Sequence, residues 1–149
     1  MASICRRLLV TSSEDVGLSY PNAITIVKSC VDTAMQVGLP EARFALAQAT
    51  VLLATSPKSN SLHLAIDNAL NDLEYNYNMD IPSHLKDSHY KDAKKIGRGI
   101  DYKYPHSYPN NYVEQQYLPD NLKDKVYYIP QNNKIERNIE NFIKTLKKG

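Results

Sequence analysis

Residues 21–55 decide the fold, and their sequence is PNAITIVKSCVDTAMQVGLPEARFALAQATVLLAT. In its first half apolar residues recur at steps of three and four, with polar residues on the opposite side, which predicts an amphipathic helix. Pro21 begins that helix at a position where a missing N–H costs nothing, and Gly38 ends it. The apolar stripe consists of Ala23, Val27, Cys30, Ala34 and Val37.

The second half, residues 40–55, predicts a helix of another kind. Pro40 begins it, and residues 42–54 are apolar on nearly every side, without a polar face. A helix of this composition is central, and its many alanines allow close approach of a second helix, within the domain or between subunits. As an interface between subunits we predict Glu41, Arg43, Phe44, Ala47, Gln48 and Val51.

The flanking segments complete a helical bundle. A short apolar stripe, Ile4, Cys5, Leu8 and Leu9, precedes a loop with a turn glycine at residues 14–17. Residues 56–60 break the chain after the central helix, and Asn60 or Ser61 caps a further helix that reaches Tyr77. Its stripe is Leu62, Ile66, Ala69, Leu70, Leu73 and Tyr77. The three helices between residues 21 and 77, joined by short loops, predict an antiparallel bundle and an all-α fold.

The amino-acid composition of the chain changes after residue 78. Residues 79–130 are rich in Tyr, Pro, Lys, Asp and Asn, and the prolines forbid long regular elements. We predict a short helix from Asp87 to Ile96 and tyrosines that supply the burial of an irregular arm. Ile135, Ile139, Phe142 and Leu146 then form a C-terminal helix. The domain prediction is a bundle over 1–78, with the arm and last helix, 79–149, packed on it as one structural unit.

Composition favours a cytoplasmic globular domain. Of the 149 residues, 42% are hydrophobic and 23% charged, and the net charge is +2. No apolar run suits a signal peptide or a membrane span. The two cysteines, Cys5 and Cys30, are expected to be reduced and buried, with a disulfide as the alternative. Because the helical pattern begins almost at Met1, we expect the chain to be part of a longer protein.

The sequence matches the motifs of enzymes only weakly. Gly97-Arg98-Gly99 is a lone G-x-G without a preceding strand, and the sequence has no phosphate-binding loop, which predicts that this chain is not an enzyme on its own. His84, Asp87 and His89 could be drawn as metal ligands, but their spacing fits no helix-face pair and no cysteines support them. We therefore expect no metal and no cofactor within these residues.

The strongest binding candidate is a basic and aromatic stretch in the second half of the chain, where the positive charge is concentrated. Its cations would contact phosphates and its tyrosines would stack on bases. The alternative is a solvated charged face with inward tyrosines, which the interruptions at Asp92 and Asp101 favour. The candidate residues are Lys91, Lys94, Lys95, Arg98, Lys103, Tyr102 and Tyr104.

Several ordered strings resemble one known family. They include residues 12–18 (SSEDVGL), 38–43 (GLPEAR), 54–60 (ATSPKSN), 102–106 (YKYPH) and 116–119 (QYLP), with Tyr127-Tyr128 after them. Together they resemble the C-terminal region of the replication-associated recombination protein A (RarA/MgsA) family of AAA+ ATPases, from about residue 3 to the end. The chain departs from the family at residues 131–134, where QNNK replaces a glycine-containing turn, while Glu136 remains.

The resemblance implies more than the composition does. The fold would be an all-helical collar similar to that of clamp-loader subunits, and it would drive formation of a tetramer. ATP and magnesium would belong to an N-terminal AAA+ module outside these residues, so no catalytic residue is carried over. The whole protein would act at stalled replication forks, associated with the nucleoid, with fork DNA and single-strand binding protein as partners.

Overall fold

The computed structural model describes residues 1–75, 80–87 and 99–147. Within these ranges the regular structure is helical, and none of the residues lies in a strand, which confirms the predicted all-α class. The five α-helices are α1 (Ala2–Thr11), α2 (Ala23–Val37), α3 (Ala42–Thr55), α4 (Ser61–Tyr75) and α5 (Lys134–Leu146). Contacts divide the chain into two compact units, one of Met1–Asp67 with Tyr127–Glu140 and one of Asn68–Val126 with Asn141–Gly149.

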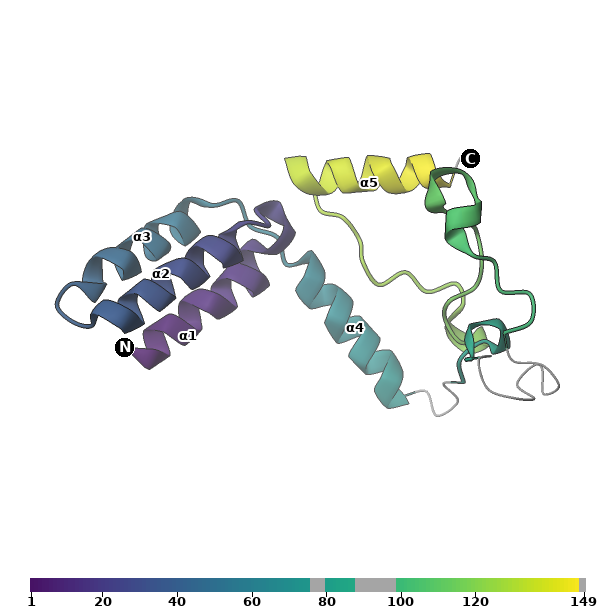
Figure 1. Cartoon of the computed structure of the whole chain (residues 1–149), viewed down its shortest axis with the longest axis horizontal. Helices are drawn as coiled ribbons and strands as arrows, with labels where there is room; N and C mark the ends of the chain where they lie inside the picture. Colours follow the sequence, from purple (N-terminus) through teal and green to yellow (C-terminus); the bar gives the residue numbers. More distant parts are fainter. Residues whose placement is uncertain (76–79, 88–98, 148–149) are drawn as a thin grey trace. The chain divides into compact units, whose positions relative to one another are not determined.

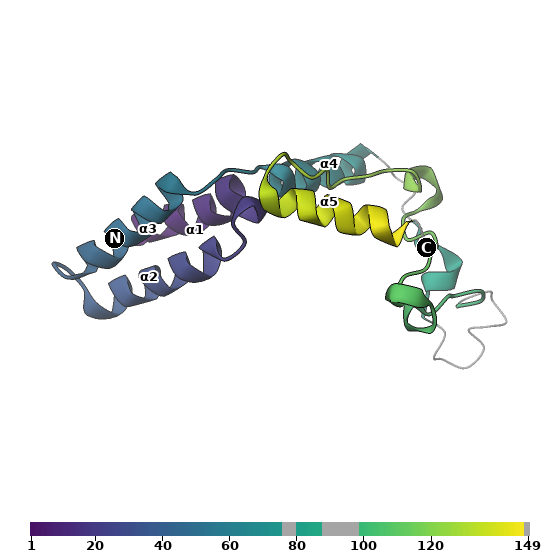
Figure 2. The same cartoon turned by 90° about the horizontal axis from the view of Figure 1, so that it is seen from above.

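The first unit is built on three helices that lie side by side (Figures 1 and 2). Helix α2 packs mainly on α3, and α1 packs on both. The core contains small residues at the α2–α3 contact, among them Ala34 and Ala49, which are fully buried. Cys5 and Cys30 are buried in the same region as free thiols. Burial of apolar surface between these helices is the main source of their stability.

The turn at residues 14–17 differs from the predicted loop. Residues Ser12–Val16 form one wide helical turn of the π type, followed by a 3₁₀ turn at Gly17–Ser19. The Ser12 hydroxyl donates to the Leu9 carbonyl (2.6 Å), so the chain keeps a helical course beyond α1. Gly17 has φ +48° and ψ −131°, a conformation that glycine adopts readily, and it redirects the chain toward α2.

The bundle includes α1, which packs on α2 and α3. The connection between α3 and α4 is bonded to the turns that follow α1. The Ser59 N–H donates to the Asp15 carbonyl (2.8 Å), and the Ser19 hydroxyl donates to the Pro57 carbonyl (2.7 Å). These bonds hold the connection on the Ser12–Ser19 turns.

The second unit contains 3₁₀ turns at Ser83–Leu85, Pro105–Ser107, Pro109–Asn111 and Asp120–Leu122. The predicted helix from Asp87 to Ile96 falls almost entirely outside the described residues. Leu122 is buried in this unit. Tyr102, Tyr104, Tyr108 and Tyr117 are exposed, so the prediction that the arm's tyrosines supply its burial is wrong for these four.

Helix α5 confirms the predicted C-terminal helix. Its stripe follows the steps of four and three that the sequence shows, and Lys144 lies in the last turn, where a cation suits the helix dipole. Asn133 caps its first turn, because the Asn133 side-chain oxygen accepts from the Glu136 N–H (3.0 Å). None of the helices in the described part of the chain has the length and apolarity needed to cross a membrane.

Candidate functional site

The outer face of α3 is an apolar surface that is exposed in the first unit. Phe44 is 66% exposed and Val51 is 61% exposed, although both belong to a helix whose other side is buried. The Arg43 guanidinium carbon lies 4.9 Å from the centroid of the Phe44 ring, within range of a cation–π interaction. The structure brings together on this side all six residues predicted for an interface, and all six are exposed: Glu41, Arg43, Phe44, Ala47, Gln48 and Val51.

A groove between α1 and α3 lies on another side of the same unit. Its volume is about 540 Å³, and Ile4 and Leu8 from α1 meet Leu53 and Ala54 from α3 along it. Arg7 and Lys58 also line it, and the described residues of its wall include no carboxylate. The Lys58 ammonium donates to the Leu53 carbonyl (2.7 Å) at the end of α3. The groove is therefore apolar along its length and cationic at its rim.

A buried carboxylate, Glu136, organises the first unit near that groove. Its side chain is fully buried, which is rare for a glutamate unless its oxygens are well paired. Oε1 accepts from the Ser59 hydroxyl and from the Asn133 amide (3.0 Å). Oε2 accepts from the Gln131 N–H (2.8 Å) and the Tyr128 hydroxyl (3.2 Å).

Glu136 stays ionised although it is buried, because these hydrogen-bond donors stabilise its negative charge. Burial raises the pKa of the carboxyl, but the hydrogen bonds from Ser59, the Gln131 backbone, Asn133 and Ser61 outweigh it and leave the pKa below its ordinary value. The pKa of the neighbouring Tyr128 shifts in the opposite direction. Its burial, together with the Glu136 charge and their hydrogen bond, raises the pKa of Tyr128 to about 12. The pair therefore consists of a carboxylate and a neutral phenol at physiological pH.

Glu136 joins segments that are far apart in the sequence. Ser59 lies in the connection between α3 and α4, 77 residues before Glu136, and that connection is itself bonded to the Asp15 turn. The Gln131 side chain also reaches the Asn60 side chain. The arrangement is a lock that fastens the start of α5 to the helical bundle.

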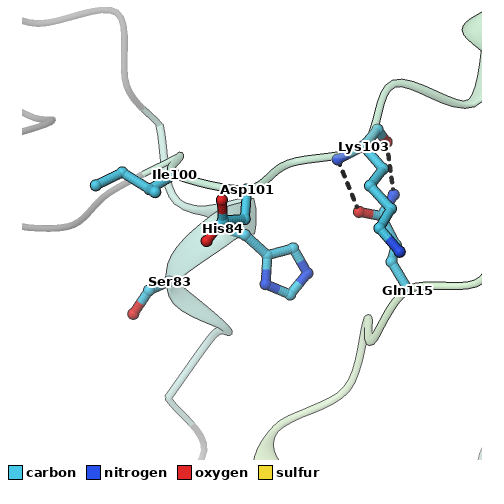
Figure 3. Close-up of a pocket in the computed structure, with 6 residues that line it drawn as sticks. All are labelled: Ser83, His84, Ile100, Asp101, Lys103 and Gln115. Carbon is cyan, nitrogen blue, oxygen red and sulfur yellow. Dashed lines mark hydrogen bonds between the residues drawn. The ribbon is translucent and has the colours of Figure 1, made fainter.

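A polar pocket of about 500 Å³ lies in the second unit (Figure 3). Figure 3 shows the ring of His84 on one side of it and the paired Lys103 and Gln115 on the other. The Gln115 amide accepts from the Lys103 N–H (3.2 Å) and donates to the Lys103 carbonyl (2.9 Å), so a side chain pairs with the backbone as a neighbouring strand would. His84 donates to the Gln116 carbonyl (2.8 Å).

The candidate metal ligands are only partly described. His84 uses one ring nitrogen on a backbone carbonyl, and His89 lies outside the described residues. In the ranges that the structure covers, no group of three or more His, Cys, Asp or Glu side chains is arranged to hold a metal ion. Gly97 and Arg98 of the weak G-x-G motif also fall outside the described ranges.

The nucleic-acid candidates divide in the same way. Lys91, Lys94, Lys95 and Arg98 lie outside the described residues. Tyr102, Lys103 and Tyr104 lie within them, and all three are exposed. Of these three, Lys103 lines the polar pocket. The Tyr104 ring lies 5.2 Å from that of His106, at an angle of 49°. The alternative of inward tyrosines is therefore wrong for Tyr102 and Tyr104.

Sequence reasoning missed the groove and the lock. The groove follows from the packing of α1 on α3, which no local pattern shows. The lock had one local signal: Asn133-Lys134-Ile135-Glu136 has the spacing of a helix-capping box. That signal predicts an acid at the third helical position, but it says nothing of the serines that bury it.

These features define an all-helical module with one internal lock and two open apolar surfaces. The chain belongs to the family described as MgsA AAA+ ATPase C terminal, whose model matches residues 1–147. It is 57% identical over 131 residues to replication-associated recombination protein A of Bacillus subtilis, a match that covers 88% of this chain and 31% of that protein.

Other relatives extend the same comparison. Replication-associated recombination protein A of Escherichia coli K12 is 36% identical over 137 residues, covering 91% of this chain and 31% of the relative. The ATPase WRNIP1 of Dictyostelium discoideum is 32% identical over 126 residues, covering 84% of this chain and 14% of the relative. The chain spans about a third of the length of the bacterial relatives.

Proposed function

We propose that this chain is the self-association module, forming a tetramer, of a AAA+ DNA-dependent ATPase that acts in replication-fork maintenance and recombination. The observation that carries the proposal is the uncovered outer face of α3, where Phe44 and Val51 are both more than 60% exposed. Side chains of this size on a soluble domain mark surfaces that another protein covers. The names of the relatives refer to replication-associated recombination, which supports this setting.

The cofactors and partners that we propose belong to the full-length protein. ATP and magnesium would be bound by its AAA+ module, and fork DNA and single-strand binding protein would be partners of the full length. We place it in the cytoplasm, associated with the nucleoid. In this division of labour the present chain contributes no catalytic group and sets the number of ATPase modules that act together.

Sedimentation equilibrium of the 149-residue chain tests the proposal. We expect a tetramer at micromolar concentration, and we expect Phe44→Glu to abolish that tetramer because it buries a charge in an apolar contact. Met35→Glu is the matched control, since Met35 is also an exposed apolar residue but lies on α2. A monomeric parent chain, or a tetramer that Phe44→Glu leaves intact, would contradict the proposal.

A second function is favoured by the exposure of Tyr102 and Tyr104 beside Lys103. Two exposed rings flanking a cation provide a surface on which single-stranded bases can stack. The test is fluorescence anisotropy with a labelled single strand and a labelled fork across a salt series. We expect Tyr102→Ala with Tyr104→Ala to weaken binding about tenfold or more. Lys123→Ala serves as the control, and the absence of any binding at low salt would exclude this function.

A further inference from the structure

The groove between α1 and α3 is formed by residues of the first unit alone. Leu53 is only 4% exposed, whereas Ile4 is 53% exposed, so a buried side chain lies beside an open apolar wall. Leu8 and Ala54 continue this apolar lining. A hollow of about 540 Å³ is within the size range of pockets that bind ligands, and its lining favours an occupant with apolar side chains.

Two cations determine the charge of this groove. Arg7 lines it from α1, and Lys58 lines it from the connection after α3. The Lys58 ammonium is held in position because it donates to the Leu53 and Ser56 carbonyls at the end of α3. Arg7 is exposed and forms no hydrogen bond or ion pair with the residues that the structure describes. Since the described lining also contains no carboxylate, the groove attracts an anionic occupant.

A smaller pocket of about 330 Å³ adjoins the groove, because Thr11 and Lys58 line both. It also belongs to the first unit, and its other lining residues are polar: Asp15, Ser59, Asn60 and Gln131. The Asp15 carboxylate opposes a second carboxylate on that side of Lys58. A negative group of an occupant is therefore favoured near Arg7, with its apolar side chains beside it in the groove.

We propose that the α1–α3 groove binds a short acidic and apolar segment of a partner protein, with apolar side chains against Ile4 and Leu8 and a carboxylate at Arg7. A guanidinium suits a carboxylate because it can donate two parallel hydrogen bonds to it. The lining from Ser3 to Thr11 extends about 12 Å along α1, which matches about four residues of an extended segment. The inference is independent of the proposed self-association, which uses different residues of α3.

The experiment selects ligands for the 149-residue chain from a displayed library of random twelve-residue peptides. We expect the selected peptides to contain at least two apolar side chains next to one or more aspartates or glutamates. Fluorescence anisotropy then measures the affinity of the labelled peptides. Ile4→Ser should weaken binding about tenfold, because apolar burial is lost. Arg7→Glu should weaken it by at least about tenfold, because an attraction becomes a repulsion between like charges.

Each substitution has a matched control in the same unit. Arg6→Glu reverses the neighbouring exposed charge of α1, which is not part of the described groove lining, and Ile24→Ser removes an exposed apolar side chain from α2. Both controls should leave the affinity nearly unchanged, and far-UV circular dichroism checks that all four variants keep their helices. Peptides whose acidic residues are changed to lysine should bind the Arg7→Glu chain more tightly than they bind the parent chain.

Three outcomes would overturn the inference. The first is a selection in which no peptide depends on Ile4 and Arg7, or in which the peptides that do are basic. The second is a smaller assembly of Ile4→Ser than of the parent chain in sedimentation equilibrium, which would assign the groove to a second copy. The third is displacement of the peptides by a labelled single strand, which would assign the groove to nucleic acid. Phe44→Glu should leave peptide binding unchanged, so a failure of the self-association proposal is a separate result.

Discussion

At the scale of single residues, the buried charge of Glu136 has the clearest energetic consequence. Glu136→Gln replaces one acceptor oxygen with an amide that faces donors, so at least one buried hydrogen bond is lost. We expect a loss of roughly 2–4 kcal/mol in the free energy of unfolding at neutral pH. Urea denaturation measures it, and Glu14→Gln at an exposed position in the same unit is the control.

The same residue makes stability depend on pH. Because the folded state lowers the pKa of Glu136, its contribution is fully present above the ordinary value of 4.5 and is lost as the pH falls through the lower folded value. The parent chain should therefore lose stability below pH 4.5 more steeply than Glu136→Gln does. Parallel acid dependences for the two chains would show that the lock carries no charge.

Gly17 permits a second test at this scale. A Cβ atom at Gly17 would lie 3.0 Å from the Ser59 carbonyl oxygen, and φ there is +48°. Gly38 has φ +71° and open space around its missing Cβ, so it isolates the backbone effect. We expect Gly38→Ala to cost about 1–3 kcal/mol and Gly17→Ala to cost more. Thermal unfolding of both variants checks this, and equal costs would contradict the close approach to Ser59.

At the scale of elements, the periodicity of apolar residues was sufficient to place α1, α2, α3 and α5 in the sequence. It was also sufficient to place α4, but not to say what covers it. An apolar stripe indicates that one face of a helix will be buried against another element. Which element covers that face depends on how the connection before the helix is held. Here a hydrogen bond joins Ser59, in the connection before α4, to a carboxylate 77 residues away, and no local pattern contains it.

The candidate sites also could be predicted from the sequence only where a local pattern contains them. The outer face of α3 could be predicted because an all-round apolar helix is visible in the sequence itself. The groove could not be predicted, since it is formed by residues of α1 and α3 that are far apart in the sequence, such as Ile4 and Leu53. The exposure of Tyr102 and Tyr104 also could not be predicted, because a tyrosine suits both burial and solvent.

Close packing between α2 and α3 makes a prediction about these two elements. Ala34 and Ala49 are fully buried, so the helices approach closely where their side chains are small. Ala49→Leu should destabilise the chain by about 1–3 kcal/mol through overpacking. Gln36→Leu, on the exposed side of α2, controls for added apolar volume. Chemical denaturation compares the two, and a stable Ala49→Leu chain would mean that the contact contains space.

At the scale of the whole molecule, self-association couples stability to concentration. A chain that is folded and assembled gains stability from its partners by mass action, so its melting temperature rises with concentration. A hundredfold dilution should lower the midpoint by on the order of 10 °C for a chain of this size. The outer face of α3 is the surface whose burial would supply this gain.

Differential scanning calorimetry over that dilution series separates assembly from intrinsic stability. The parent chain and Met35→Glu should show the full dependence on concentration. Phe44→Glu should melt at one temperature throughout, because the outer face of α3 then carries a charge that opposes burial. A midpoint of the parent chain that does not change with dilution would show that the exposed residues of α3 stay in solvent, and that this chain folds as a monomer.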